Sequence, residues 1–115
     1  MRLFVYGTLK RGFSNHNILK NSLFIEEDSI NGFQMHDMGN FPGITKKRNS
    51  VVYGEVYEID EITLMDCDCL EGYPLFYDRK KVKTRKGNTA TVYFLKKCDF
   101  PVINYGLWLD KKVYH

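Results

Sequence analysis

The sequence lacks any apolar run near the roughly 20 residues that a membrane-spanning helix needs. Met1 leads directly into strand-like sequence rather than into a secretory signal. Cysteine is scarce and odd in number, because Cys67, Cys69 and Cys98 are the only three. A disulfide framework is therefore not expected, and reduced thiols fit an intracellular site. We expect a cytoplasmic protein without a membrane partner.

An excess of charge of one sign is also lacking, since 17 basic residues stand against 14 acidic ones and leave a net charge of +3. Such a small excess does not favour a nucleic-acid partner. The most basic segment is residues 79–86, in which Lys81, Lys83 and Arg85 alternate with Val82 and Thr84. This alternation favours a strand with one solvated basic face over a nucleic-acid-binding stripe. At 115 residues with 43% hydrophobic content, the chain is expected to form one domain over residues 1–115.

What the chain does have is a short apolar strand that runs into a glycine turn at its start. Leu3, Phe4 and Val5 have the β-branched and aromatic character of a buried strand, and Gly7 interrupts it. Glycine can adopt backbone conformations closed to other residues, so successive N–H groups of the turn can converge on one carboxylate or oxyanion. An ordinary strand-to-loop exit explains the same residues, because short glycine motifs have little specificity alone.

An acidic helix is predicted over residues 61–71, with Asp60 as its N-cap. Asp66, Asp68 and Glu71 gather in its second half, where the helix dipole and mutual repulsion disfavour negative charge. A local rule that is broken without evident gain often marks a functional site. A short, exposed acidic helix remains the alternative interpretation.

The other segments are mostly strand-like, and Gly54 is expected to mark a bulge or a close approach of another segment. Strands are predicted at residues 23–30 and 32–38 around a tight Asn31-Gly32 turn, and at residues 51–59, 77–84 and 89–95. A short helix is expected to end near residue 20, a surface loop to cover residues 39–50, and the aromatic tail with Trp108 to cover the core. This pattern predicts the α+β class, as a small mixed or antiparallel β-barrel with two flanking helices. The inward face of the acidic helix is expected to hold Ile62, Met65 and Cys69.

Three motifs together resemble the gamma-glutamylcyclotransferase-like (AIG2-like) superfamily. They are Val5-Tyr6-Gly7-Thr8-Leu9, Leu70-Glu71-Gly72-Tyr73-Pro74 and Tyr53-Gly54-Glu55-Val56-Tyr57. The continuation Lys10-Arg11-Gly12 with Asn15-His16 is most similar to the gamma-glutamylamine cyclotransferase branch. The resemblance covers most of the chain, and it implies a small barrel with outer helices and a cavity at one end.

The resemblance also implies an activity, that of a cofactor-independent lyase-type cyclotransferase acting on a small molecule. Such an enzyme releases 5-oxoproline and a free amine from a γ-glutamyl amine or a γ-glutamyl amino acid. Glu71 matches the glutamate that accepts the proton in the family. The loop that holds the glutamyl group through its backbone is matched by Tyr6, Gly7, Thr8 and Leu9.

Further matches concern the walls of the expected cavity. Tyr77 and Arg79 match the family's Tyr-X-Arg and are expected to line or brace it. Asn15 and His16 are expected to fix the loop after Gly12 rather than to transfer protons. No metal is expected, because Cys67 and Cys69 would point to different sides of a helix.

The chemistry needs few groups. The α-amino group of a bent γ-glutamyl substrate can attack its own γ-carbonyl once a base has removed its proton. Backbone amides can stabilise the oxyanion, and the same carboxylate can protonate the leaving amine. Asp68 nearby and burial near Tyr73 and Pro74 are both expected to raise the pKa of Glu71 toward neutrality.

Two other functions stay open at this point. A non-catalytic protein of the same fold could use the amides to bind a small carboxylate, and the basic face at residues 79–86 could bind nucleic acid in a salt-sensitive way. The sequence does not indicate which amine the substrate carries or how many chains associate.

Overall fold

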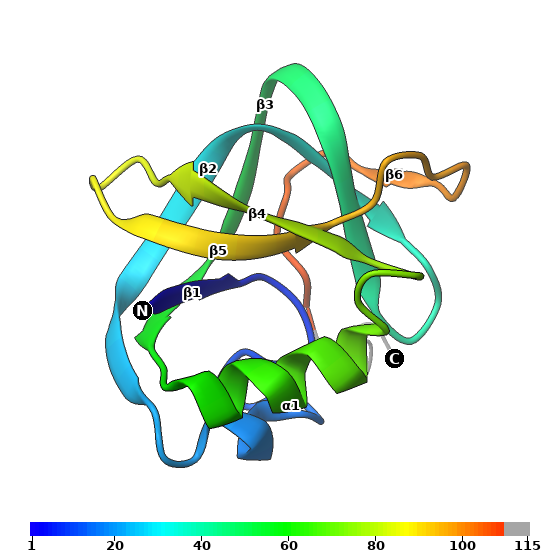
Figure 1. Cartoon of the computed structure of the whole chain (residues 1–115). Coiled ribbons are helices and arrows are strands. Elements are labelled where there is room, and N and C mark those ends of the chain that lie inside the picture. The colour runs from blue at the N-terminus through cyan, green and yellow to red at the C-terminus, as the bar shows by residue number, and fades with distance from the viewer. Residues whose placement is uncertain (110–115) are drawn as a thin grey trace.

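The chain folds as a six-stranded mixed sheet with one α-helix, as a computed structural model of residues 1–109 describes it (Figure 1). The order across the sheet is β4-β5-β1-β3-β2-β6, in which only the β1–β5 pair is parallel. The elements are β1 (Arg2–Val5), the 3-10 helix η1 (His16–Leu19), β2 (Leu23–Asp37), β3 (Pro42–Glu58), α1 (Glu61–Glu71), β4 (Asp78–Lys83), β5 (Thr89–Phe94) and β6 (Val102–Ile103).

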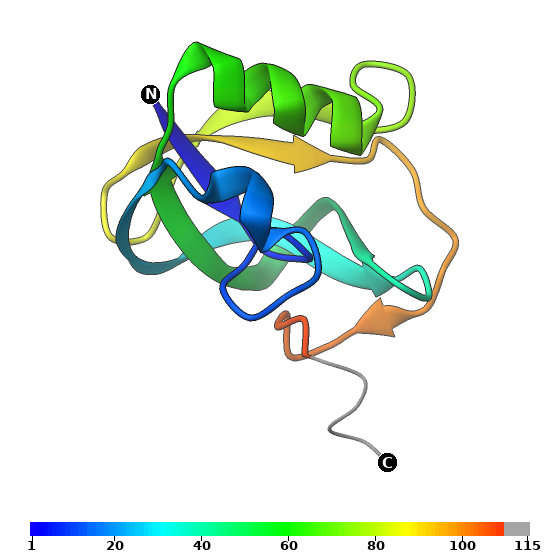
Figure 2. The same ribbon diagram turned by 90° about the horizontal axis from the view of Figure 1, so that it is seen from below.

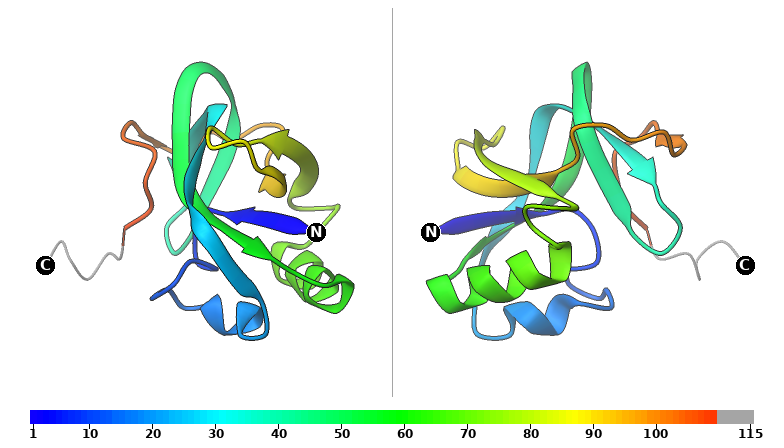
Figure 3. Two further views of the ribbon diagram at one scale, coloured as in Figure 1. Left: turned by 90° about the vertical axis from the view of Figure 1, so that its left-hand side faces the viewer. Right: turned by 45° about the vertical axis from the view of Figure 1, so that its right-hand side comes forward.

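The predicted α+β class with a mixed sheet is confirmed. The sheet coils strongly without closing, and β4 and β6 form its two edges (Figure 3). The first of the two predicted helices is only the single turn η1, in which Asn15 occupies the N-cap position without a side-chain capping bond. The sheet is therefore an open, coiled relative of the predicted barrel.

The predicted hairpin at Asn31-Gly32 is wrong, because β2 continues through it as one strand of 15 residues. Gly32 has a φ of +86° and sits at a register shift, so the glycine serves a β-bulge and not a turn. Phe33 and Met35 continue the pairing with β3 beyond it and are buried. Tertiary burial of these two side chains outweighs the local turn preference of Asn-Gly.

The predicted loop at residues 39–50 is also largely wrong. The chain turns at Met38 to Phe41, and β3 starts already at Pro42 and pairs with Asp37. Only residues 47–50 leave the β2–β3 register, and Asn49 there has a φ of +62°. Glycine, proline and lysine at these positions suggested a loop, whereas long-range pairing makes most of the segment a strand.

β1 lies at the centre of the sheet and separates two clusters of buried side chains. Its residues alternate, so that Phe4 faces the hollow of the coiled sheet and Leu3 and Val5 face the helices. The predicted cover from the C-terminal segment is confirmed for Trp108, which is buried in the cluster of Phe4. Figure 2 shows the helical side, where η1 and α1 cover β1.

The α1 helix begins and ends as predicted, but it buries a different face. The Asp60 side chain accepts a hydrogen bond of 2.8 Å from the Thr63 amide, and Gly72 ends the helix in the left-handed conformation. Ile62 and Met65 are 71% and 66% exposed, and Cys69 is exposed too. The buried residues are Thr63 and Cys67, whose small side chains allow the helix to lie close to the sheet.

Within residues 1–109, the structure contains no helix whose length and apolar character would allow it to cross a membrane.

At Gly54, β1 and β3 approach closely, which is one of the two roles that the sequence suggested for this glycine. A Cβ atom there would overlap the carbonyl oxygen of Val5 and lie 2.8 Å from Cζ of Phe4. We expect Gly54→Ala to lower the free energy of unfolding by about 3 kcal/mol or more, because the central strand pair must separate. Urea denaturation measures this, with the exposed Lys81→Ala as a control expected within about 0.5 kcal/mol of wild type. A Gly54→Ala protein as stable as the control would contradict the close approach.

Candidate active site

A cavity of about 320 Å³ lies between the turn after β1, the end of α1 and the β2–β3 turn. Its size is in the range of small-molecule sites, roughly 300–1,000 Å³. Figure 1 shows the last turn of α1 and the β2–β3 turn toward the same side of the molecule. The lining residues are Phe4, Val5, Tyr6, Gly7, Thr8, Leu9, Ser14, Asn15, Asn40, Phe41, Pro42, Leu70, Glu71, Phe76, Tyr77 and Tyr93.

The turn after β1 lines this cavity, and its carbonyl groups are bound to residues elsewhere in the loop. The carbonyl oxygen of Gly7 accepts from the Lys10 amide at 3.1 Å, and that of Thr8 accepts from the Asn15 amide at 2.9 Å. In a trans peptide the N–H group points away from the carbonyl group, so the amides of Thr8 and Leu9 face the other way. No acceptor within residues 1–109 takes a hydrogen bond from either amide.

Gly7 is needed at this turn for a different reason from the predicted one. Its φ is not positive, and the constraint is space: a Cβ atom would lie 2.8 Å and 2.9 Å from Cγ and Cδ of Pro42. Glycine therefore allows the β2–β3 turn to close one side of the cavity.

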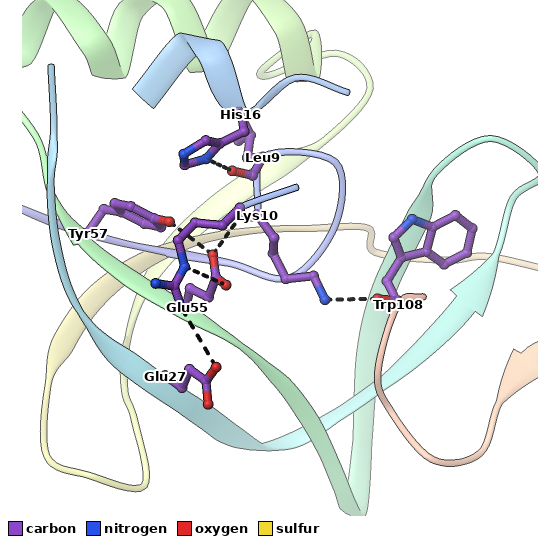
Figure 4. A network of polar contacts seen from close by, with 8 residues as sticks. Leu9, Lys10, His16, Glu27, Glu55, Tyr57 and Trp108 are labelled. Carbon is purple, nitrogen blue, oxygen red and sulfur yellow. Dashed lines mark hydrogen bonds and ion pairs between the residues drawn. The ribbon is translucent and has the colours of Figure 1, made fainter. Parts of the chain in front are cut away.

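A network of polar contacts joins the loop after β1 to β3 and to the C-terminal segment (Figure 4). The buried Glu55 on β3 accepts hydrogen bonds from the Arg11 amide at 2.9 Å and from the Tyr57 hydroxyl at 3.0 Å. Lys10 is buried as well, and its Nζ donates to the Trp108 carbonyl oxygen at 2.8 Å. The loop is thus tied both to the sheet and to the C-terminal segment, which keeps its amides in place.

Asn15 and His16 also bond to the turn itself. The Asn15 side-chain amide donates to Thr8 Oγ1 at 2.9 Å, and His16 Nδ1 lies 2.9 Å from the Leu9 carbonyl oxygen. Because that oxygen can only accept, Nδ1 carries the proton. Both residues therefore fix the loop through hydrogen bonds, as the sequence suggested.

Glu71 reaches the cavity because of its position on α1. Thr63, Cys67 and Glu71 are four residues apart, so they share one helix face, and the first two are buried against the sheet. Glu71 is the last residue of α1 and lies at the end of this face, half-buried, where the cavity begins. The acidic end of the helix thus turns one carboxylate inward.

Burial raises the pKa of Glu71 to about 7. The predicted second cause, the charge of Asp68, is not involved. Asp68 forms an ion pair with Arg79 and accepts a hydrogen bond of 2.7 Å from the Tyr93 hydroxyl. No salt bridge within residues 1–109 reaches Glu71, so its ionised form is poorly stabilised and its neutral form persists near pH 7.

Two buried tyrosines border the cavity near Glu71. The Tyr6 hydroxyl donates to the Tyr93 carbonyl oxygen at 2.7 Å, and the Tyr77 hydroxyl donates to the Pro42 carbonyl oxygen at 2.6 Å. Burial, and to a smaller extent the charge of Glu71, raises the pKa of both phenols. Each hydroxyl proton is already used, so only the oxygen lone pairs remain to accept from a ligand.

Of the seven residues predicted for the site, the structure brings six to one cavity, and Arg79 lies outside its lining. Arg79 pairs with Asp68 and packs over the Tyr73 ring at 4.2 Å from the ring centroid, so it braces the end of α1. Phe41, Phe76 and Tyr93 also line the cavity, and the sequence did not indicate them. No local motif marks them: Phe41 lies in the β2–β3 turn, Phe76 in the segment between α1 and β4, and Tyr93 on β5.

The cysteines do not gather, since Cys67 is buried and Cys69 is exposed on the other side of α1. Burial raises the pKa of the Cys67 thiol to about 12. No group of three or more metal-ligating side chains converges in the part of the chain that the structure describes.

Comparisons with known proteins agree with this architecture. The family described as "Gamma-glutamyl cyclotransferase, AIG2-like" matches residues 3–110. The "Gamma-glutamylcyclotransferase family protein ytfP" of Citrobacter rodentium is 34% identical over 115 residues, which cover 99% of this chain and 100% of that protein. The crystal structure of an uncharacterised Pyrococcus horikoshii protein has a TM-score of 0.81 at 30% identity and covers 93% of this chain and 88% of its own.

A further relative has a name that states its substrate. The "Gamma-L-glutamyl-butirosin B gamma-glutamyl cyclotransferase" of Niallia circulans is 40% identical over 72 residues, which are 62% of this chain and 46% of that protein. The match over nearly the whole length to the family, together with the similar folds, confirms the resemblance seen in the sequence. This chain belongs to the AIG2-like gamma-glutamyl cyclotransferase family.

Proposed function

We propose that this chain is a cofactor-independent cyclotransferase that converts a γ-glutamyl amide into 5-oxoproline and a free amine, with Glu71 as the proton shuttle. One observation carries the proposal: the cavity that Glu71 shares with the amides of the turn after β1. Family membership supports the reaction class, and the named substrate of the Niallia circulans relative supports a γ-glutamyl group carried by an amine.

The reaction starts with proton transfer to Glu71. Its carboxylate takes a proton from the α-ammonium of the bound substrate, and the freed amine attacks the γ-carbonyl carbon. A pKa near 7 suits this step, because the base is partly ionised at neutral pH and still binds the proton firmly. The oxygens of Tyr6 and Tyr77 accept hydrogen bonds from the ammonium and hold it beside the carboxylate.

The tetrahedral oxyanion that forms next is stabilised by the amides of Thr8 and Leu9. When it collapses, the bond between the γ-carbon and the leaving nitrogen breaks and Glu71 returns its proton to that nitrogen. The ring nitrogen also gives up one of its two protons, which passes to the leaving amine. The amine therefore leaves as an ammonium ion, and the lactam nitrogen is neutral. No water, metal or external reactant enters this balance.

We expect Glu71→Gln to lower kcat at least about 100-fold with γ-glutamyl amines, since general acid–base catalysis typically contributes 10²–10⁴. The measurement is 5-oxoproline release across a panel of γ-glutamyl amines and amino acids. Asp66→Asn, an exposed carboxylate on the same helix, is the matched control and should keep wild-type activity. If wild type and Glu71→Gln are equally inert with every compound, the enzymatic proposal fails, and ligand binding unchanged by Glu71→Gln would favour a carboxylate-binding protein.

The pH profile of kcat/KM should rise with pH and level off above an inflection near pH 7, because only ionised Glu71 accepts the proton. Initial rates between pH 5 and 9 test this. An essential group with an ordinary carboxyl pKa would put the inflection well below pH 6 and would exclude a buried Glu71 as the base.

Stability should depend on pH in the opposite sense. The folded-state pKa of Glu71 lies above its unfolded value, so its contribution is fully present below about pH 4.5 and is lost as pH rises through about 7. Glu71→Gln should therefore be more stable than wild type at pH 8 by about 1–3 kcal/mol, an amount reduced by solvent in the cavity, and the gain should shrink toward pH 5. Urea denaturation at both pH values measures it, and a gain that is equal at pH 5 and pH 8 would argue against a raised pKa.

A further inference from the structure

The cavity has polar groups at its floor, and exposed apolar side chains form one side of its mouth. Tyr6 and Tyr77 are buried at 7% and 4% exposure, and they lie with the turn amides at the floor. Leu70, Phe76 and Phe41 line the same cavity but keep 39%, 51% and 36% of their surface exposed, which puts them at the opening.

The aromatic rings form a continuous wall from floor to mouth. The Tyr77 and Phe76 ring centroids are 4.9 Å apart in an edge-to-face arrangement, and Phe76 meets Phe41 in the same way at 6.2 Å. One wall of the path from the floor to the mouth therefore consists of aromatic rings. Exposed rings at the edge of a pocket favour an apolar group, because its binding removes their surface from water.

The direction of the substrate follows from the proposed function, on which this inference rests. Cyclisation places the α-nitrogen and the γ-carbon beside Glu71 at the floor. The substituent on the leaving nitrogen is then the part of the substrate that extends to the mouth, where it contacts Phe41, Phe76 and Leu70.

The charges of the lining residues also indicate which substituents on the leaving nitrogen are favoured. The lining includes no lysine, arginine or histidine from residues 1–109, and the nearby Arg79 is paired with Asp68. A carboxylate on the leaving group would lose water beside apolar rings without gaining a cation, which is unfavourable. We infer that the preferred substrates are γ-glutamyl amides of apolar aromatic or branched alkyl amines that carry no carboxylate.

A matched pair of substrates tests this inference on the wild-type protein. γ-Glutamyl-2-phenylethylamide and γ-glutamyl-phenylalanine differ only in one carboxylate on the leaving amine. We expect kcat/KM for 5-oxoproline release to be at least about tenfold higher for the amide, as for other single-group discriminations in pockets. Equal rates, or faster release from γ-glutamyl-phenylalanine, would overturn the inference and leave the proposed function intact. Release from neither compound nor from γ-glutamyl-methylamide would remove both.

Variants at the mouth give an independent test. Phe76→Ala should lower the ratio of kcat/KM for the phenylethylamide over the methylamide about tenfold, because the methyl group is too short to reach the ring. Leu75→Ala is the control, since Leu75 is 97% exposed and does not line the cavity, and its ratio should stay within about twofold of wild type. A ratio that Phe76→Ala leaves unchanged would contradict the contact.

The reverse experiment adds the missing cation. Asn40 lies exposed at the mouth, so Asn40→Arg can bring a guanidinium near the leaving group without removing an aromatic ring. We expect it to raise kcat/KM for γ-glutamyl-phenylalanine relative to the phenylethylamide severalfold. No change in this preference would contradict the inference that the lack of a cation at the mouth disfavours carboxylates.

Discussion

Burial of the Glu71 carboxyl without a cation beside it is the constraint on which the site depends. A carboxylate at the end of an acidic helix would ordinarily face water, but the small buried face formed by Thr63 and Cys67 draws α1 close to the sheet and turns Glu71 inward. The free-energy cost of burying the charge raises its pKa to about 7. Asp68, only three residues earlier, is paired with Arg79 and satisfied by Tyr93, so the two acids have different environments and different uses.

The turn after β1, which shares the cavity with Glu71, is fixed by hydrogen bonds to neighbouring segments. Its carbonyl groups accept hydrogen bonds from Lys10, Asn15 and His16. Glu55 on β3 accepts a hydrogen bond from the amide of Arg11. The amides are therefore oriented before any ligand binds, which is the condition for electrostatic stabilisation without reorganisation. The position of Trp108 in the core and its bond to Lys10 extend this support to the C-terminal segment.

The floor and the mouth of the cavity are built from different segments of the chain. The floor consists of the turn after β1, Glu71 at the end of α1 and Tyr77 just before β4. Phe41 at the mouth belongs to the β2–β3 turn, whose place is set by a strand pair that continues through a bulge at Gly32. Shifting that pair by one residue would exchange its inward and outward side chains, so the shape of the mouth is coupled to the register of the longest strands.

Local residue patterns determined the elements that depend on local rules: the β1 strand, the helix from Asp60 to Gly72 with both of its ends, the β4–β5 hairpin and the close approach at Gly54. The family motifs also indicated which residues would surround the cavity. Only the tertiary structure decided that Asn31-Gly32 would form a bulge, that Ile62 and Met65 would face solvent, and that Arg79 would brace α1 rather than line the cavity. The physical reason is that capping and turn preferences act between neighbours in sequence, whereas strand register, helix orientation and the choice of ion-pair partner minimise the free energy of contacts between distant segments.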